Sequence, residues 1–151
     1  MKAIWYTRQG PAHDVLQYGE QPEPHAAAGE VRIKLYASGV NPADIYRRAG
    51  PNFKMDGPLI IPNSDGAGIV DEAGRGVDRG LIGRRVWLYN GQRNGRVFGT
   101  AAEYITISDD LVRELPRNTT FHEGACLGIP AMTAHVAVSR GGDIKDRPVF
   151  V

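Results

Sequence analysis

The sequence predicts a mainly β fold with short helices, and three observations lead to this prediction. The 151 residues include 19 glycines and 10 prolines, which lie without a period between apolar runs, as in a chain with many turns between short strands. Residues 30–38 alternate between apolar and polar side chains, the pattern of a strand with one buried face. The helix signals are few and short, at residues 41–50 and 120–139.

The N-terminal part contains two strand candidates. Residues 1–7 alternate in polarity and are followed by Gly10 and Pro11, which end a strand. Residues 15–18 form a second, short candidate. The proline- and alanine-rich residues 21–29 are expected to form a loop.

The strand at residues 30–38 has the clearest pattern in the chain. Its apolar positions are Val31, Ile33, Leu35 and Ala37, and the positions between them are Arg32, Lys34, Tyr36 and Ser38. We therefore expect the first set to face a core and the second set to reach water.

A short helix is predicted directly after this strand. Asn41 is a preferred helix cap, Pro42 suits the first helical position, and Asp44 places a carboxylate in the first turn. Gly50 and Pro51 end the helix. On this pattern Asp44 is interpreted as the carboxylate of the capping turn.

The middle of the chain alternates strands with glycine-rich loops. Further strands are predicted at residues 67–72, 85–89 and 102–107, with a turn at residues 63–66 before the first of them. Residues 90–99 (NGQRNGRVFG) form a long polar loop. Two interpretations of this loop stay open, one side of a substrate site or a solvated hairpin.

The last part of the chain is predicted to be helical. Thr120 and Glu123 match the capping box, and the helix that follows is expected to be interrupted at residues 128–130 and to resume at residues 131–139. Residues 147–151 (RPVFV) indicate the start of a buried strand. Because such a strand needs neighbours, we expect the chain to be the N-terminal part of a longer protein. The alternative is a domain whose last strand pairs at a sheet edge.

Charge and cysteine content limit the classes of function. The formal net charge is +1, with no basic run, which argues against nucleic acid as a partner. The single cysteine, Cys126, allows no internal disulfide and no cysteine-rich metal site, and we expect it to be a small buried apolar residue. The N-terminus lacks a signal-type apolar core and no apolar run approaches the ~18 residues of a membrane span, so we expect a cytoplasmic protein without membrane contact.

Five stretches, taken together and in their order, resemble one known family. They are KAIWYTRQGPAHDVLQYGE, GEVRIKLYASGVNPADIYRRAG, GAGIVDEAGRGV, GTAAEYITI and GACLGIPAMTAHVAV. The set is similar to the quinone oxidoreductase and zeta-crystallin branch of the medium-chain dehydrogenase/reductase superfamily. The resemblance covers nearly all of the chain and is specific only as a set.

The resemblance implies a division into two parts. Residues 1–125 would form a catalytic domain with a GroES-like, partly open β-barrel. Residues 126–151 would supply a helix and the first strand that lead into a Rossmann nucleotide-binding domain. The glycine fingerprint of that domain is absent, because residues 66–68 and 74–76 lack its third glycine and flank a strand instead of joining a strand to a helix.

The resemblance also identifies the positions of a zinc site. Zinc-binding members of the superfamily have a ligand cysteine just after the strand equivalent to residues 30–38, and a ligand histidine in a G-H-E motif. Here Asn41 stands at the cysteine position and Asn63-Ser64-Asp65 at the G-H-E position. Protein zinc ligands are thiolate, imidazole or carboxylate groups, so we expect no bound metal. The histidines are interpreted as surface or core residues; they are His13, His25, His122 and His135.

The activity that the resemblance implies is NADPH-dependent transfer of hydride to a quinone or an α,β-unsaturated carbonyl, without zinc. Such acceptors delocalise the incoming charge, and the carbonyl oxygen then needs a hydrogen-bond donor. The implied catalytic donors are the amide of Asn41 and the phenol of Tyr46, and the implied cofactor contacts are Asn41, Tyr46 and Thr133. The complete protein is expected to be a homodimer.

Plainer interpretations stay open. Asn41 can serve only as a helix cap, and Tyr46 only as a packed aromatic with a hydrated hydroxyl. For the whole chain, one alternative is a non-enzymatic GroES-like module for interaction or oligomerisation. Another is a zinc alcohol dehydrogenase, against which the missing ligands argue.

Overall fold

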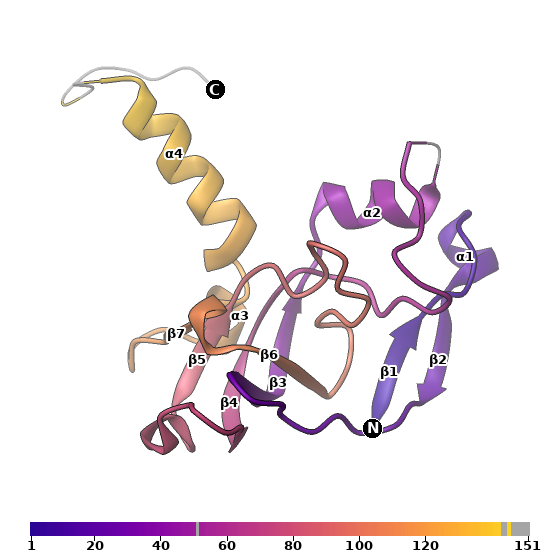
Figure 1. Cartoon of the computed structure of the whole chain (residues 1–151). Helices are drawn as coiled ribbons and strands as arrows, with labels where there is room; N and C mark the ends of the chain where they lie inside the picture. The colour runs from indigo at the N-terminus through magenta and orange to yellow at the C-terminus, as the bar shows by residue number, and fades with distance from the viewer. Residues whose placement is uncertain (51, 143–144, 146–151) are drawn as a thin grey trace.

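The computed structural model describes residues 1–50, 52–142 and 145. Within them the chain forms a five-stranded antiparallel sheet, in the order β6-β3-β4-β5-β7, and a two-stranded sheet of β1 and β2 (Figure 1). The strands are β1 (Lys2–Trp5), β2 (Gln17–Glu20), β3 (Glu30–Gly39), β4 (Asp65–Ala73), β5 (Arg85–Leu88), β6 (Tyr104–Ser108) and β7 (Val112–Glu114). The prediction of a mainly β fold with short helices is confirmed, and the described strands do not close into a barrel.

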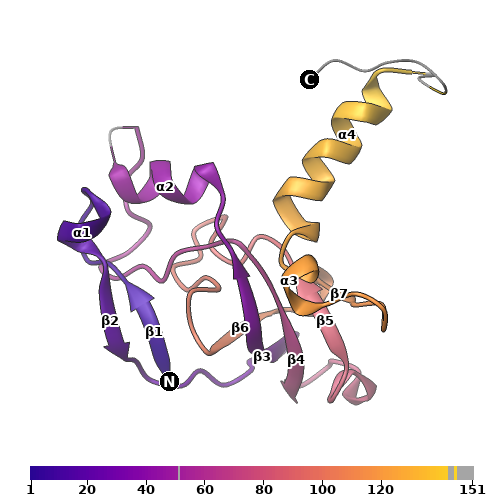
Figure 2. The ribbon, with the colours of Figure 1, turned by 180° about the vertical axis from the view of Figure 1, so that it is seen from behind.

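Four α-helices accompany the strands in the described part of the chain. They are α1 (Ala12–Val15), α2 (Pro42–Ala49), α3 (Phe121–Gly124) and α4 (Met132–Arg140). In the views from the front and from behind, α2 and α4 rise from the same end of the sheets and stand apart, with α4 projecting from the body (Figures 1 and 2). None of the helices in the described residues is long and apolar enough to span a membrane.

The core lies on one face of the larger sheet, with β3 and β4 at its centre. Its buried members are Val31, Ile33, Val70, Val77, Val86, Leu88, Ile105, Ile107 and Val112. Each such side chain contributes about 1.5–3 kcal/mol by leaving water. The predicted alternation in β3 is confirmed at Val31 and Ile33, which are fully buried, whereas Leu35 and Ala37 are only half-buried. At this point the ladder between β3 and β6 ends at Lys34, and the register between β3 and β4 shifts between Leu35 and Ala37.

The predicted helix after β3 is confirmed at both of its ends. Asn41 has extended backbone before the helix, Pro42 opens it, and Gly50 ends it with a φ of 97°. This left-handed conformation suits glycine because it has no Cβ. Asn41 follows the end of β3, so the helix starts where this interior strand of the sheet ends.

Two predicted strands have other bounds in the structure, and one strand was missed. Residues 15–18 are not one strand, since α1 ends at Val15 and β2 begins two residues later. β4 begins at Asp65, earlier than predicted, because the turn before it is made by Asn63 with a φ of 75°. β7 was not predicted. β2 and β7 are short and mainly polar, and each exists through pairing with a distant strand, β1 and β5.

The two incomplete glycine motifs have packing roles. Residues 66–68 lie inside β4, and residues 74–76 lie in the turn after it. A Cβ on Gly68 would come within 2.1 Å of the Lys34 carbonyl oxygen, and a Cβ on Gly74 within 1.7 Å of the Ala27 carbonyl oxygen. Neither motif opens an α-helix, as a phosphate-binding loop does.

The predicted interruption of the C-terminal helix is confirmed. The Thr120 hydroxyl accepts from the Glu123 amide at 3.2 Å and the Glu123 carboxylate accepts from the Thr120 amide at 2.7 Å, which completes the capping box of α3. A kinked segment (Leu127–Ala131) follows, with non-helical backbone at Gly128, before α4 begins. The strand predicted at residues 147–151 lies outside the described residues.

Candidate active site

The positions that the resemblance equates with zinc ligands lie together at one end of the larger sheet. Asn41 follows β3, Ser64 precedes β4, and Asp65 is the first residue of β4. Gly39 and Asp65 are partners in the antiparallel register, so the two strand ends coincide. The exposed fractions are 4% for Asn41, 5% for Asp44 and 0% for both Ser64 and Asp65.

Asp65 accepts two hydrogen bonds on one oxygen. Its Oδ2 atom accepts from the side-chain amide of Asn41 at 2.8 Å and from the backbone amide of Ile129 at 2.9 Å. Its Oδ1 atom is buried and has no hydrogen-bond partner among the described residues. A Cβ placed on Gly128 would come within 2.2 Å of Oδ1, so the backbone there lies directly against the carboxyl group.

Asp44 is the second carboxyl group of the site. It accepts from the backbone amide of Asn41 at 2.8 Å, which confirms its role in the capping turn. Its other oxygen lies 3.4 Å from the donor hydroxyl of Ser64. The sequence did not indicate that this carboxyl group is buried, because an aspartate in a first helical turn usually faces water.

Burial raises the pKa values of both carboxyl groups above the ordinary range. For Asp65 the amide of Asn41 opposes the rise in pKa, and for Asp44 the backbone amide of Asn41 does so. The negative charge of Asp44 raises the pKa of Asp65 further, whereas Arg93 lowers the pKa of both groups. The free Oδ1 atom can hold a proton while Oδ2 keeps its two hydrogen bonds.

A second set of hydrogen bonds fixes the strand ends around the carboxyl groups. Asn63 donates to the Ser38 hydroxyl at 2.9 Å. The hydroxyls of Ser38 and Thr100 share a hydrogen bond at 2.8 Å. The Thr100 hydroxyl also donates to the backbone carbonyl of Asp65 at 2.7 Å. Thr100 is fully buried. These contacts hold β3, the turn before β4 and the segment after the long loop together.

The loop at residues 90–99 is anchored on the same network. The backbone amide of Gly91 donates to the Ser64 carbonyl at 2.8 Å, and the Gln92 carbonyl accepts from Arg47 at 2.8 Å. Gln92 is 2% exposed. Of the two open interpretations, a solvated hairpin does not describe this part of the loop, because it packs against the site.

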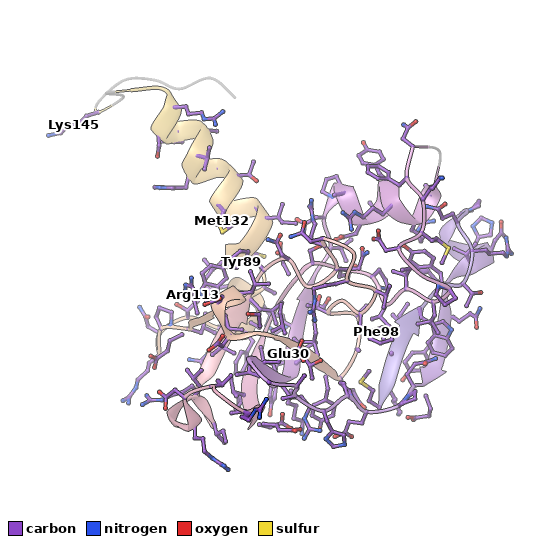
Figure 3. The ribbon with its side chains drawn as sticks, viewed as in Figure 1. Glu30, Tyr89, Phe98, Arg113, Met132 and Lys145 are labelled. Atoms are coloured by element: carbon purple, nitrogen blue, oxygen red, sulfur yellow. The ribbon has the colours of Figure 1, made fainter. Side chains whose placement is uncertain are left out.

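The three predicted site residues differ in their surroundings. Asn41 is buried with its amide directed at Asp65, whereas Tyr46 is 62% exposed on α2. Thr133 is exposed in the first turn of α4. Figure 3 shows the side chains of α4 projecting from the helix, with Met132 at its lower end. The structure thus places Asn41 in the network and leaves Tyr46 and Thr133 facing outward on two separate helices.

Cys126 and the four histidines are the other side chains that could bind a transition metal. The expectation that Cys126 is buried was wrong, since it is exposed just before the kinked segment. The apolar neighbours of Cys126 in the sequence did not indicate this exposure. All four histidines are exposed, as expected of surface residues. The described residues contain no group of three or more histidine, cysteine or acidic side chains placed to hold a metal ion.

Comparison with known proteins identifies the fold. The alcohol dehydrogenase GroES-like domain matches residues 27–117. The chain belongs to this family. Quinone oxidoreductase from Mus musculus is 36% identical to it over 127 residues, which are 81% of this chain and 36% of the relative. The 2-methylene-furan-3-one reductase of Solanum lycopersicum is 30% identical and aligns with 100% of this chain and 40% of its own length.

Solved structures place this GroES-like domain in the quinone oxidoreductase branch of the medium-chain superfamily. The quinone oxidoreductase from Coxiella burnetii superposes with a TM-score of 0.83 and 29% identity, over 93% of this chain and 44% of that one. A mycobacterial protein solved with NADPH superposes with a TM-score of 0.79 and 28% identity, over 95% of this chain and 42% of that one. The chain therefore spans less than half the length of these relatives.

Proposed function

We propose that this GroES-like domain is the catalytic part of an NADPH-dependent oxidoreductase that transfers hydride to a quinone or an α,β-unsaturated carbonyl without zinc. The observation that carries the proposal is the hydrogen bond between Asn41 and Asp65. It joins directly two positions at which zinc-binding members of the superfamily have metal-site residues. The relatives named as quinone oxidoreductases support the first acceptor class, and the tomato reductase supports the second.

The donor set at these positions does not suit zinc. Asn41 and Ser64 offer a neutral amide and a hydroxyl, which are poor replacements for thiolate and imidazole. Asp65 is the one carboxylate of the three positions, and its Oδ2 atom already accepts two hydrogen bonds. Charge on a reacting carbonyl oxygen would therefore be stabilised by hydrogen bonds.

The donor set does suit the nicotinamide end of a cofactor. Tyr46 and Thr133 are exposed residues that carry hydroxyl groups, and the amide nitrogen of Asn41 keeps one hydrogen after its bond to Asp65. The bound nicotinamide would supply the hydride. In the proposed mechanism Tyr46 donates a hydrogen bond or proton to the acceptor oxygen, and Asn41 and Thr133 orient the ring.

The same proposal includes the division of the chain and its assembly. Residues 1–125 act as the catalytic domain, and residues 126–151 lead into a nucleotide-binding domain. The complete protein works as a cytoplasmic homodimer. The exposed apolar side chains on α4 support the division, because they offer a surface to a further domain; they are Met132, Val136 and Val138.

The test compares the 151-residue chain with a fusion in which it is followed by the unmatched part of the mycobacterial relative solved with NADPH. Calorimetry measures NADPH binding, and a spectrophotometric assay follows NADPH oxidation with quinones and with enones. We expect the chain alone to bind NADPH weakly or not at all and to lack activity, and the fusion to reduce at least one acceptor class. A fusion that binds NADPH but reduces neither class would contradict the proposal.

A further inference from the structure

The Oδ2 atom of Asp65 connects segments that are far apart in the sequence. Asn41, 24 residues away, leads into α2. Ile129, 64 residues away, lies in the kinked segment that leads into α4. One atom at the start of β4 therefore contacts the segments immediately before both helices that carry the proposed cofactor contacts.

The packing around this atom leaves little freedom. A Cβ on Gly39 would come within 2.5 Å of the Ala125 carbonyl oxygen, so the end of β3 lies directly against the chain before the kink. A Cβ on Gly128 would come within 2.2 Å of the Asp65 Oδ1 atom, and Asp65 is fully buried. The two helices are thus tied to the sheet through short polar contacts between buried groups, where a hydrogen bond to a charged group is strong.

We infer that Asp65 is a positioning residue, which holds the start of α2 and the segment before α4 in a fixed relation. It acts on the site through Asn41 on one side and through Ile129 on the other. This inference rests on the proposed function for its consequence in catalysis, since Tyr46 and Thr133 lie on the two helices. The contacts themselves do not depend on that function.

A replacement for Asp65 must keep an acceptor at the position of Oδ2, which accepts both hydrogen bonds. In Asp65→Asn the amide oxygen can take the place of Oδ2 and accept both hydrogen bonds, with the amide nitrogen at the position of Oδ1. In Asp65→Ala both acceptors are lost. Gly128→Ala leaves Asp65 intact but places a Cβ against Oδ1, so it should disturb the junction from the other side. Asp71→Ala is the matched control, because Asp71 lies on the same strand and pairs with Arg32 instead.

The first experiment is amide hydrogen exchange measured by NMR on the 151-residue chain. In Asp65→Ala and in Gly128→Ala the Ile129 amide should exchange about tenfold faster or more than in the wild type. Asp65→Asn and Asp71→Ala should stay close to the wild type. An unchanged Ile129 amide in Asp65→Ala would overturn the inference, as would an equal acceleration at the core amides of Ile33 and Val70, which would indicate a merely structural role.

The second experiment measures quinone reduction by the fusion. Asp65→Ala should lower kcat about tenfold or more, with a much smaller change in the KM for quinone, because misplaced groups affect the reacting geometry more than binding. Asp65→Asn should recover most of the loss. If the wild-type fusion binds NADPH but reduces neither acceptor class, the proposed function fails while the exchange experiment still decides the inference. If the fusion is active and Asp65→Ala keeps its kcat, the catalytic consequence of the inference is overturned.

Discussion

The side chains of Asn41 and Asp65 meet at 2.8 Å, with the amide of the first donating to the carboxylate of the second. Both are buried at the paired ends of β3 and β4. Because each group is the hydrogen-bond partner of the other, this contact bears on metal binding at these positions, on the protonation of Asp65 and on the position of α2.

The purified domain should contain far less than one zinc ion per chain. The reason is that Asn41 and Ser64 replace a thiolate and an imidazole. The double variant Asn41→Cys with Ser64→His supplies both ligand types beside Asp65, and it should bind zinc more tightly than the wild type does. Elemental analysis after purification with zinc measures both proteins. A wild-type protein with about one zinc per chain would contradict the prediction.

Tyr46→Phe should slow turnover of the fusion more than it weakens NADPH binding. The variant keeps the ring, and Tyr46 is 62% exposed, so folding should be unaffected. A lost hydrogen bond to charge in the transition state costs roughly 2–4 kcal/mol. The control is Tyr18→Phe, which removes another exposed hydroxyl, on β2. Equal turnover of the two variants with quinones and enones would leave Tyr46 without a part in the mechanism.

The free energy of unfolding of the wild type should fall as the pH rises, and Asp65→Asn should lack the part of this fall that comes from Asp65. Burial raises the pKa of Asp65 above its ordinary value of 3.8, so the native state binds the proton more tightly than the unfolded chain does. The stabilisation from this group is complete below 3.8 and is lost as the pH rises through the raised pKa.

Urea unfolding at a series of pH values measures this effect. The free energy of unfolding of the wild type, relative to Asp65→Asn, should fall as the pH rises and then become constant. Asp71→Asn is the control on the same strand. A difference that grows in favour of the wild type with rising pH would show that the carboxylate is better stabilised in the native state than in the unfolded one.

Thr120→Ala should destabilise the domain by about 1 kcal/mol, because it removes the acceptor that caps α3. The Thr120 hydroxyl also donates to the Glu123 carboxylate at 2.8 Å, and the two bonds from Thr120 lower the pKa of Glu123. The neighbouring variant Thr119→Ala is the control. Urea unfolding of both measures the difference, and NMR titration of Glu123 should show its pKa returning upward in Thr120→Ala.

Local signals in the sequence determined several elements of this protein. The alternation of apolar and polar residues in β3 predicts one buried face, whichever strands pair with β3. The full burial of Val31 and Ile33 confirms this prediction. The helix start at Asn41-Pro42 and the capping box at Thr120 are interactions between residues within one turn, so the sequence contains them completely. The family resemblance depends on the same linear order of motifs.

Tertiary structure decided the features that depend on distant residues. The burial of Asp65 and its contacts with Asn41 and Ile129 join three segments, and no local pattern contains that meeting. The short strands β2 and β7 exist through their partners, β1 and β5. The physical reason is the same in each case: a buried polar contact or an edge strand is stabilised by groups from elsewhere in the chain, and only folding brings them within hydrogen-bond distance.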